Sequence, residues 1–294
     1  RYVDTAPYYG FGLSERRLGD RLREYAAEFV LSTKVGRLLR PMPGHAGDAD
    51  RHGYRSPMPF EPVFDYGYDA VMRSFEDSLQ RLGLARIDIL LVHDIGTATH
   101  GPANTRHFRD LATGGYRALA ELRAAGRIRA IGLGVNEWQV CEAAMQHGDY
   151  DCFLLAGRYT LLEQTALDSF LPKCAAAGAT LIVGGAYNSG ILARGTRHPG
   201  THYYNYEAAP AAVVDRVRRI EAVCDAHSVS LAAAALQFPL AHPLVSSVIP
   251  GLDNPPRVKQ TLALYNERIP PAFWSDLQGA GLVRADAPVP GAAG

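Results

Sequence analysis

The 294-residue sequence has little lysine, only four cysteines and no apolar run long enough to cross a membrane. Its 30 basic and 30 acidic residues cancel, and no run of like charge forms the basic stripe that nucleic-acid binding requires. The cysteines are scattered and contain no CxxC pair, which is typical of reduced thiols in a cytoplasmic protein. We therefore expect a cytoplasmic protein with a small-molecule partner, without nucleic acid or membrane, in an oligomeric state that the sequence leaves open.

The sequence also lacks an N-terminal methionine and a signal peptide, and Arg1-Tyr2-Val3 has the pattern of a strand that has already begun. We expect a segment to be missing upstream of it. The ten histidines do not show HExxH or comparable ligand spacing, so we predict no catalytic metal.

Seven short apolar runs alternate with longer stretches of helical spacing. The runs are hydrophobic almost throughout, which is typical of parallel strands buried on both faces. We predict strands at residues 1–6, 29–35, 87–92, 130–135, 152–155, 180–184 and 245–249. We predict helices at residues 14–25, 68–82, 115–125, 137–147, 163–177, 211–240 and 255–266. Seven such units favour a (β/α)8 barrel whose eighth unit would precede residue 1. A doubly wound sheet is the alternative, but no GxGxxG turn supports it.

Two long insertions, at residues 37–66 and 186–209, follow predicted strand ends, where barrel enzymes build active sites. The second contains Tyr203, Tyr204 and Tyr206, which are interpreted either as a sugar-stacking lid or as a packed loop. We predict one barrel domain over residues 1–284 and a disordered tail at residues 285–294, because the tail is rich in alanine, proline and glycine.

Polar side chains stand at three predicted strand ends: Asp4, Lys34 and His93. Tyr9 follows Asp4 by five residues, close enough to fold over the same barrel mouth. Hydride transfer to a carbonyl needs a proton donor, and a tyrosine with a pKa near 10 serves only if a cation stabilises its phenolate. Lys34 would supply that cation, Asp4 would orient it, and His93 would bind the reacting oxygen. We predict these four as a catalytic tetrad, although each alone has an ordinary structural interpretation.

The stretch Asp4-Thr5-Ala6-Pro7-Tyr8-Tyr9-Gly10, with Ser14-Glu15, resembles the signature of the aldo-keto reductase family. Ser32-Thr33-Lys34, Leu91-Val92-His93, Asn136 and Val248-Ile249-Pro250-Gly251 resemble its later landmarks. The resemblance implies a (β/α)8 barrel, NAD or NADP bound without a Rossmann fold, and the same tetrad. It also implies that the family's N-terminal hairpin and first βα unit are absent from this chain.

Three further stretches resemble the D-threo-aldose 1-dehydrogenase and pyridoxal 4-dehydrogenase branch of the family. They are His93-Asp94-Ile95-Gly96 with His100-Gly101, Gly134-Val135-Asn136-Glu137, and the segment from Leu155 to Leu162. The branch implies oxidation of an aldose such as L-fucose or D-arabinose at C1 to its lactone, with Tyr9 as the base.

The resemblance also implies cofactor-binding residues, namely Asn136, Ser189, Gly190, Leu192, Pro250, Gly251, Leu252 and Arg257. Val135, Ala156 and Gly184 depart from the family pattern around the nicotinamide. Phosphate would bind to Ser189-Gly190-Ile191-Leu192 and to the backbone amides of Gly251-Leu252-Asp253, near the helix that begins at Pro255. Arg257 would pair with a 2′-phosphate. The family's NADP-preferring members commonly have a lysine at the position of Gly251, which favours NAD.

Two alternatives to an aldose dehydrogenase stay open. One is a pyridoxal 4-dehydrogenase or a general aldehyde reductase. The other, from a different class, is a non-catalytic redox-sensor subunit that binds the cofactor.

Overall fold

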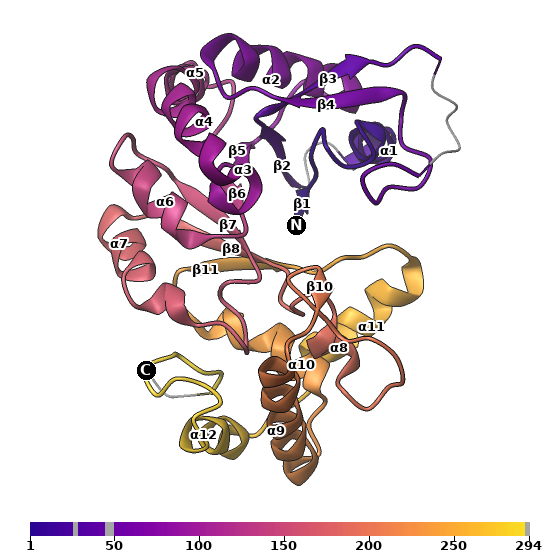
Figure 1. Cartoon of the computed structure of the whole chain (residues 1–294), viewed down its shortest axis with the longest axis vertical. Coiled ribbons are helices and arrows are strands. Elements are labelled where there is room, and N and C mark those ends of the chain that lie inside the picture. The colour runs from indigo at the N-terminus through magenta and orange to yellow at the C-terminus, as the bar shows by residue number, and fades with distance from the viewer. Residues whose placement is uncertain (26–28, 45–49, 292–294) are drawn as a thin grey trace. The chain divides into compact units, whose positions relative to one another are not determined.

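Parallel strands followed by helices build both halves of the chain. The computed structural model describes residues 1–25, 29–44 and 50–291 (Figure 1). Contacts divide it into two units, Arg1–Phe153 and Leu154–Gly294, which are described separately below. The prediction of a single domain stays a prediction.

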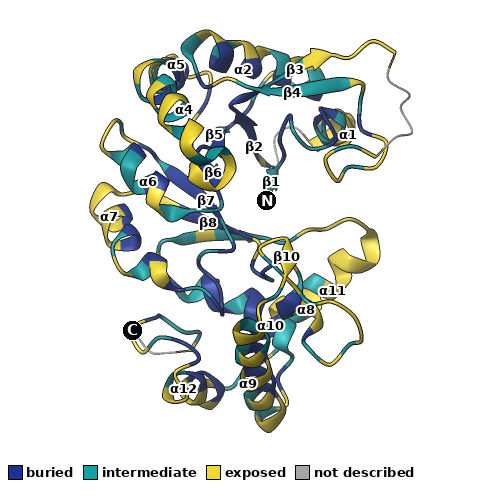
Figure 2. Ribbon diagram, in the orientation of Figure 1, coloured by how far each residue is buried: buried dark blue, intermediate teal, exposed yellow. Residues whose placement is uncertain are grey.

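The first unit contains four parallel strands that are hydrogen-bonded in chain order. They are β1 (Tyr2–Asp4), β2 (Val30–Val35), β5 (Ile89–His93) and β6 (Ala130–Val135). Almost every residue of β2, β5 and β6 is buried, as the continuous apolar pattern predicts (Figure 2). The register places Asp4 opposite Ser32 and His93 opposite Gly134, so the polar strand ends lie at one edge of the sheet.

Helices follow these strands, and the outer surfaces of α4 and α5 are exposed (Figure 2). They are α1 (Leu13–Leu22), η1 (Arg23–Tyr25), α2 (Tyr68–Leu82), α3 (Thr97–His100), η2 (Gly101–Ala103), α4 (Asn104–Asp110), η3 (Leu111–Gly115), α5 (Tyr116–Ala124) and α6 (Trp138–Met145). Helix α2 has the predicted bounds and ends at Gly83, whose left-handed conformation (φ 61°) terminates the helix.

Two buried carboxylates hold the first unit together. Glu15 of α1 is 0% exposed and accepts hydrogen bonds from Thr33 Oγ1 (2.6 Å) and Arg81 Nε (2.5 Å). Asp88 accepts a hydrogen bond from the backbone N–H of Leu31 (2.9 Å). Each carboxylate therefore links a helix or a loop to β2, the strand that positions Lys34.

The first long insertion forms a hairpin that was not predicted. Strands β3 (Arg37–Pro41) and β4 (Phe60–Phe64) pair antiparallel directly after β2, and residues 45–49 of the insertion lie outside the described residues. Gly36 precedes the hairpin at φ 106°, and a Cβ there would lie 2.4 Å from the Tyr66 ring. Only glycine fits that position, so the hairpin begins at a fixed place beside the strand ends.

Strand β7 (Cys152–Ala156) lies at the boundary between the units, and β8 (Thr180–Gly184) and β11 (Val245–Ile249) follow in the second unit. The last two pair in parallel. The remaining elements are η4 (Thr165–Leu167), α7 (Phe170–Ala177), α8 (Ile191–Arg194), β9 (Tyr203–Tyr204), β10 (Glu207–Ala208), α9 (Ala211–His227), α10 (Leu231–Gln237), η5 (Phe238–Ala241), α11 (Pro255–Asn266) and α12 (Pro271–Gly279).

All seven predicted strands are present, three of them with the predicted bounds. The single helix predicted over residues 211–240 was wrong, because Ser228 is left-handed (φ 54°) and separates α9 from α10. Helices α3, α4, α8 and α12 were not predicted.

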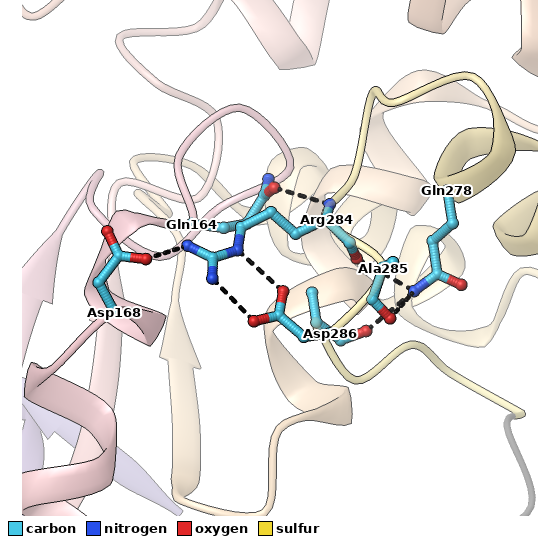
Figure 3. Close-up of polar contacts among 7 residues, drawn as sticks. Gln164, Asp168, Gln278, Arg284, Ala285 and Asp286 are labelled. Atoms are coloured by element: carbon cyan, nitrogen blue, oxygen red, sulfur yellow. Dashed lines mark hydrogen bonds and ion pairs between the residues drawn. The ribbon is translucent and has the colours of Figure 1, made fainter.

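The segment after α12 is anchored to the second unit by hydrogen bonds (Figure 3). Arg284 forms ion pairs with Asp168 and with Asp286, and its backbone N–H donates to Gln164 Oε1 at 3.2 Å. Gln278 Nε2 donates to the backbone oxygen of Ala287 at 3.1 Å. The predicted disorder of the tail stays a prediction, and residues 292–294 lie outside the described residues.

None of the described helices is long and apolar enough to cross a membrane.

Candidate active site

Asp4 and Lys34 form a buried ion pair at the ends of β1 and β2. Lys34 Nζ lies 2.6 Å from Asp4 Oδ2, and the two side chains are 2% and 9% exposed. Lys34 Nζ also donates to the backbone oxygen of Thr5 at 2.8 Å. A lysine buried to this degree requires a partner charge, and Asp4 provides it. The parallel register of β1 and β2 brings the ends of the two strands together and so fixes both side chains.

Tyr9 is placed over this ion pair by a tight loop. Gly10, Phe11 and Gly12 all have left-handed φ angles (62°, 55° and 97°) and reverse the chain after Tyr9. The ring of Tyr9 then lies with its centroid 4.8 Å from Lys34 Nζ. Two glycines at positive φ allow this reversal, which other residues adopt only with strain.

His93, at the end of β5, completes the group. Its ring packs edge-on against Tyr9, with 5.7 Å between the centroids, and it is 6% exposed. Its backbone oxygen accepts a hydrogen bond from Tyr66 at 2.9 Å. The structure therefore brings all four predicted tetrad residues together within the first unit.

Burial and charge shift the acidities of these groups in opposite directions. Burial raises the pKa of Tyr9, and the positive charge of Lys34 opposes that rise. Burial lowers the pKa of Lys34, but Asp4 and Tyr9 outweigh it and keep the pKa above its ordinary value. Burial, reinforced by Lys34 and Arg37, holds the pKa of His93 well below its ordinary value. At neutral pH the site therefore contains a charged lysine and a neutral histidine.

Three residues that sequence reasoning did not assign to the site support the tetrad. Ser32 Oγ donates to Asp4 Oδ1 at 2.5 Å and also bonds the Tyr2 hydroxyl at 2.7 Å. Gly134 leaves room for Lys34, since a Cβ there would lie 3.3 Å from Lys34 Cε. Side chains alternate along β2, so Ser32 lies on the same face as Lys34. This spacing could have predicted from the sequence that Ser32 belongs to the site.

The second unit contains a cavity of about 550 Å³ beyond the ends of β8 and β11. Ser189, Gly190, Pro250, Gly251 and Arg257, all predicted as cofactor-binding, line it. A Cβ on Gly190 or Gly251 would meet no atom within 4 Å, so both glycines face open space. These five residues are therefore brought together.

The other predicted cofactor residues are not among those that line this cavity. Leu192 is fully buried in α8, and its N–H donates to the backbone oxygen of Tyr187. Leu252 is 47% exposed and does not line the cavity. Asn136 directly follows β6 in the first unit.

The amino end of α11 offers fewer donors than the sequence suggests. Pro255 and Pro256 have no N–H, and the Arg257 N–H donates to the capping Asn254 Oδ1 at 2.9 Å. The donors for a phosphate would therefore come from the side chains around the cavity and from the preceding loop, rather than from the first turn of this helix.

The model of the aldo/keto reductase family matches residues 1–281. The chain is 46% identical to a pyridoxal 4-dehydrogenase of Microbacterium luteolum and 39% identical to a D-threo-aldose 1-dehydrogenase of a Pseudomonas species. Each alignment covers 96% of this chain and 84% of the relative.

Solved structures share the fold at lower identity. An aldo-keto reductase from Bacillus halodurans in its holo form superposes with a TM-score of 0.72 at 23% identity, over 97% of this chain and 83% of that chain. An aldo/keto reductase from Klebsiella pneumoniae in complex with NADP and acetate gives 0.61 at 19% identity, over 95% and 79%. The predicted (β/α)8 barrel type and the predicted class, an NAD(P)-dependent oxidoreductase, are confirmed. The chain belongs to the aldo/keto reductase family.

Proposed function

We propose that the chain oxidises the hemiacetal carbon C1 of an aldose to the lactone, with Tyr9 as the base and NAD(P) as the hydride acceptor. The observation that carries this proposal is the buried Lys34, which contacts both Asp4 and Tyr9. A cation buried beside a phenol is the feature that makes the phenolate accessible.

In the oxidation, the C1 hydroxyl gives its proton to the Tyr9 phenolate and C1 loses a hydride. Nicotinamide supplies the hydride acceptor when the cofactor is bound. Lys34 stabilises the phenolate before the proton arrives, and Asp4 keeps Lys34 charged. In the reverse reaction Tyr9 returns the proton to the oxygen.

His93 binds the reacting oxygen. Because its pKa is held well below the ordinary value, it is neutral and donates a single hydrogen bond without giving up a proton. This leaves proton transfer to Tyr9 alone.

The cavity of the second unit fits a nucleotide. Its two unobstructed glycines allow close approach of a ligand, and Ser189, Arg257, Gln260 and Thr261 provide polar side chains around it. We favour NAD over NADP, because Arg257 Nε lies 3.3 Å from Asp253 Oδ1. That carboxylate partly neutralises Arg257 and would repel a 2′-phosphate.

Pyridoxal is the second candidate substrate, favoured by the 46% identity to a pyridoxal 4-dehydrogenase. Both pyridoxal and an aldose carry a hydroxyl that closes onto their own aldehyde, so each presents a cyclic hemiacetal.

Initial rates of NAD+ and NADP+ reduction with L-fucose, D-arabinose, pyridoxal and a simple aldehyde test the proposal. We expect turnover of at least one sugar and its loss in Tyr9→Phe. An exposed tyrosine in the same unit, Tyr25→Phe, serves as the matched control. No cofactor reduction with either sugar would refute the aldose assignment.

A further inference from the structure

Arg37 is a buried arginine beside the tetrad that takes no direct part in the proposed proton transfer. Its guanidinium lies between two aromatic rings, 4.3 Å from the Tyr8 centroid and 4.5 Å from the Phe64 centroid, and the side chain is 6% exposed. Nη2 bonds Asp94 Oδ2 at 2.7 Å, while Nη1 is buried without a hydrogen-bond partner among the described residues. Both faces are covered, so the charge of Arg37 is fixed in place.

Asp94 is held by this arginine in a backbone conformation that is uncommon outside glycine. Its φ is 48°, and its N–H donates to the backbone oxygen of Gly134 at 3.0 Å. Non-glycine residues at such angles cluster at functional sites, because the surrounding structure must compensate the strain. The turn directs the carboxylate toward Arg37 and toward the preceding His93.

The carboxylate lies next to the atom expected to hold the substrate. Asp94 Oδ2 is 3.5 Å from His93 Nε2, and the side chain is 20% exposed, more than His93 or Arg37. A carboxylate has about four lone-pair sites and Arg37 uses one, so acceptor capacity remains. A substrate oxygen bound to His93 would bring the group on the neighbouring carbon within reach of Asp94.

We propose that Asp94, fixed by Arg37, is a specificity-determining residue that accepts a hydrogen bond from the hydroxyl on the carbon next to the reacting carbon. The inference rests on the proposed function and narrows its substrate class to neutral 2-hydroxyaldehydes in their hemiacetal form. The ionised ring hydroxyl of pyridoxal lies on the second carbon from the reacting carbon, so pyridoxal offers no hydroxyl at this position. Its negative charge would also be repelled by the carboxylate, which is more exposed than the arginine.

D-arabinose and 2-deoxy-D-ribose differ only in the C2 hydroxyl, and they test this interaction directly. We expect wild type to prefer D-arabinose in kcat/KM by about 10- to 150-fold, as for a hydrogen bond to a charged acceptor. In Asp94→Asn the preference should fall about tenfold through loss of activity on D-arabinose, while activity on pyridoxal rises or is unchanged. Asparagine tolerates the positive φ and keeps an acceptor for Arg37, so the fold should survive.

Asp69→Asn, an exposed residue in the first turn of α2, is the matched control and should keep the wild-type preference. Equal rates for the two sugars in wild type would overturn this inference but leave the proposed function standing. An unchanged preference in Asp94→Asn would do the same. An equal loss on all substrates would reduce Asp94 to a structural role and overturn it as well. No turnover of any substrate by wild type would instead overturn the proposed function, and the inference with it.

Discussion

Replacing Lys34 by methionine removes the cation beside Tyr9 while keeping much of the buried aliphatic chain. Lys34 Nζ lies 4.8 Å from the Tyr9 ring centroid, which we take as the separation of the charges. With an effective dielectric constant of about 20, the lost attraction to the phenolate is about 3.5 kcal/mol. At 1.36 kcal/mol for each pKa unit, the apparent pKa of Tyr9 should rise by about 2.5 units.

The assay is the pH profile of kcat/KM for sugar oxidation in wild type and Lys34→Met. Oxidation needs ionised Tyr9, so the rate should rise with pH in both proteins. The rising limb of the variant should be displaced to higher pH, with kcat/KM lowered by a few hundred-fold at a pH below both limbs. Reduction needs protonated Tyr9 and should show the opposite pH dependence.

Lys34→Met also leaves the Asp4 carboxylate without its cation, and breaking such a buried pair costs about 3–5 kcal/mol of stability. The double variant Asp4→Asn/Lys34→Met removes both charges and should recover part of that stability without recovering activity. Thermal melting of both variants separates the two effects. A folded Lys34→Met protein whose rate falls less than tenfold, with an unshifted pH limb, would refute the reasoning.

Three further predictions concern the surroundings of the tetrad. Ser32→Ala removes one hydrogen bond to the charged Asp4 carboxylate, which is worth about 1.5–3 kcal/mol. We expect kcat/KM to fall by roughly tenfold or more. Cofactor affinity, measured by fluorescence titration, should stay unchanged. Glu15→Ala leaves Arg81 without its buried partner and should destabilise the fold by about 3–5 kcal/mol in urea unfolding. The pKa values of His93 and His100 lie below the ordinary 6.5, about 4 for His100, so the unfolded chain binds more protons below pH 6.5. Stability should therefore fall as pH decreases from about 6.5, and His100→Gln should reduce that loss in melting curves recorded at several pH values.

The strands and the clustering of the four polar side chains near their ends could be predicted because their signals are local. A buried parallel strand must be apolar along its length, and an isolated lysine at the end of such a strand is visible in a chain that has two other lysines. The prediction of α2 followed from the helical spacing of Val71, Phe75 and Leu82. These features depend on a few neighbouring residues.

The parts that were missed depend on contacts between distant residues. The hairpin β3–β4 pairs across an insertion that contains prolines on both strands, at Pro41 and Pro62, and such residues ordinarily count against a strand. The role of Gly134 depends on a lysine 100 positions earlier, and Arg37 lies in an insertion for which the sequence predicted a place near the active site but no particular residue. The spacing of residues along the sequence contains no information on such contacts between distant residues.

The charges around the tetrad form two opposed pairs, and this arrangement determines how the proposed reaction depends on pH. Asp4 with Lys34 and Asp94 with Arg37 are each neutral as a pair, and His93 is uncharged. Ionising Tyr9 therefore adds one net negative charge to a buried site, which explains why its pKa stays raised despite the nearby lysine. Because its raised pKa keeps Tyr9 protonated at neutral pH, the proposed mechanism predicts that carbonyl reduction is faster there and that oxidation of a sugar becomes faster as the pH rises.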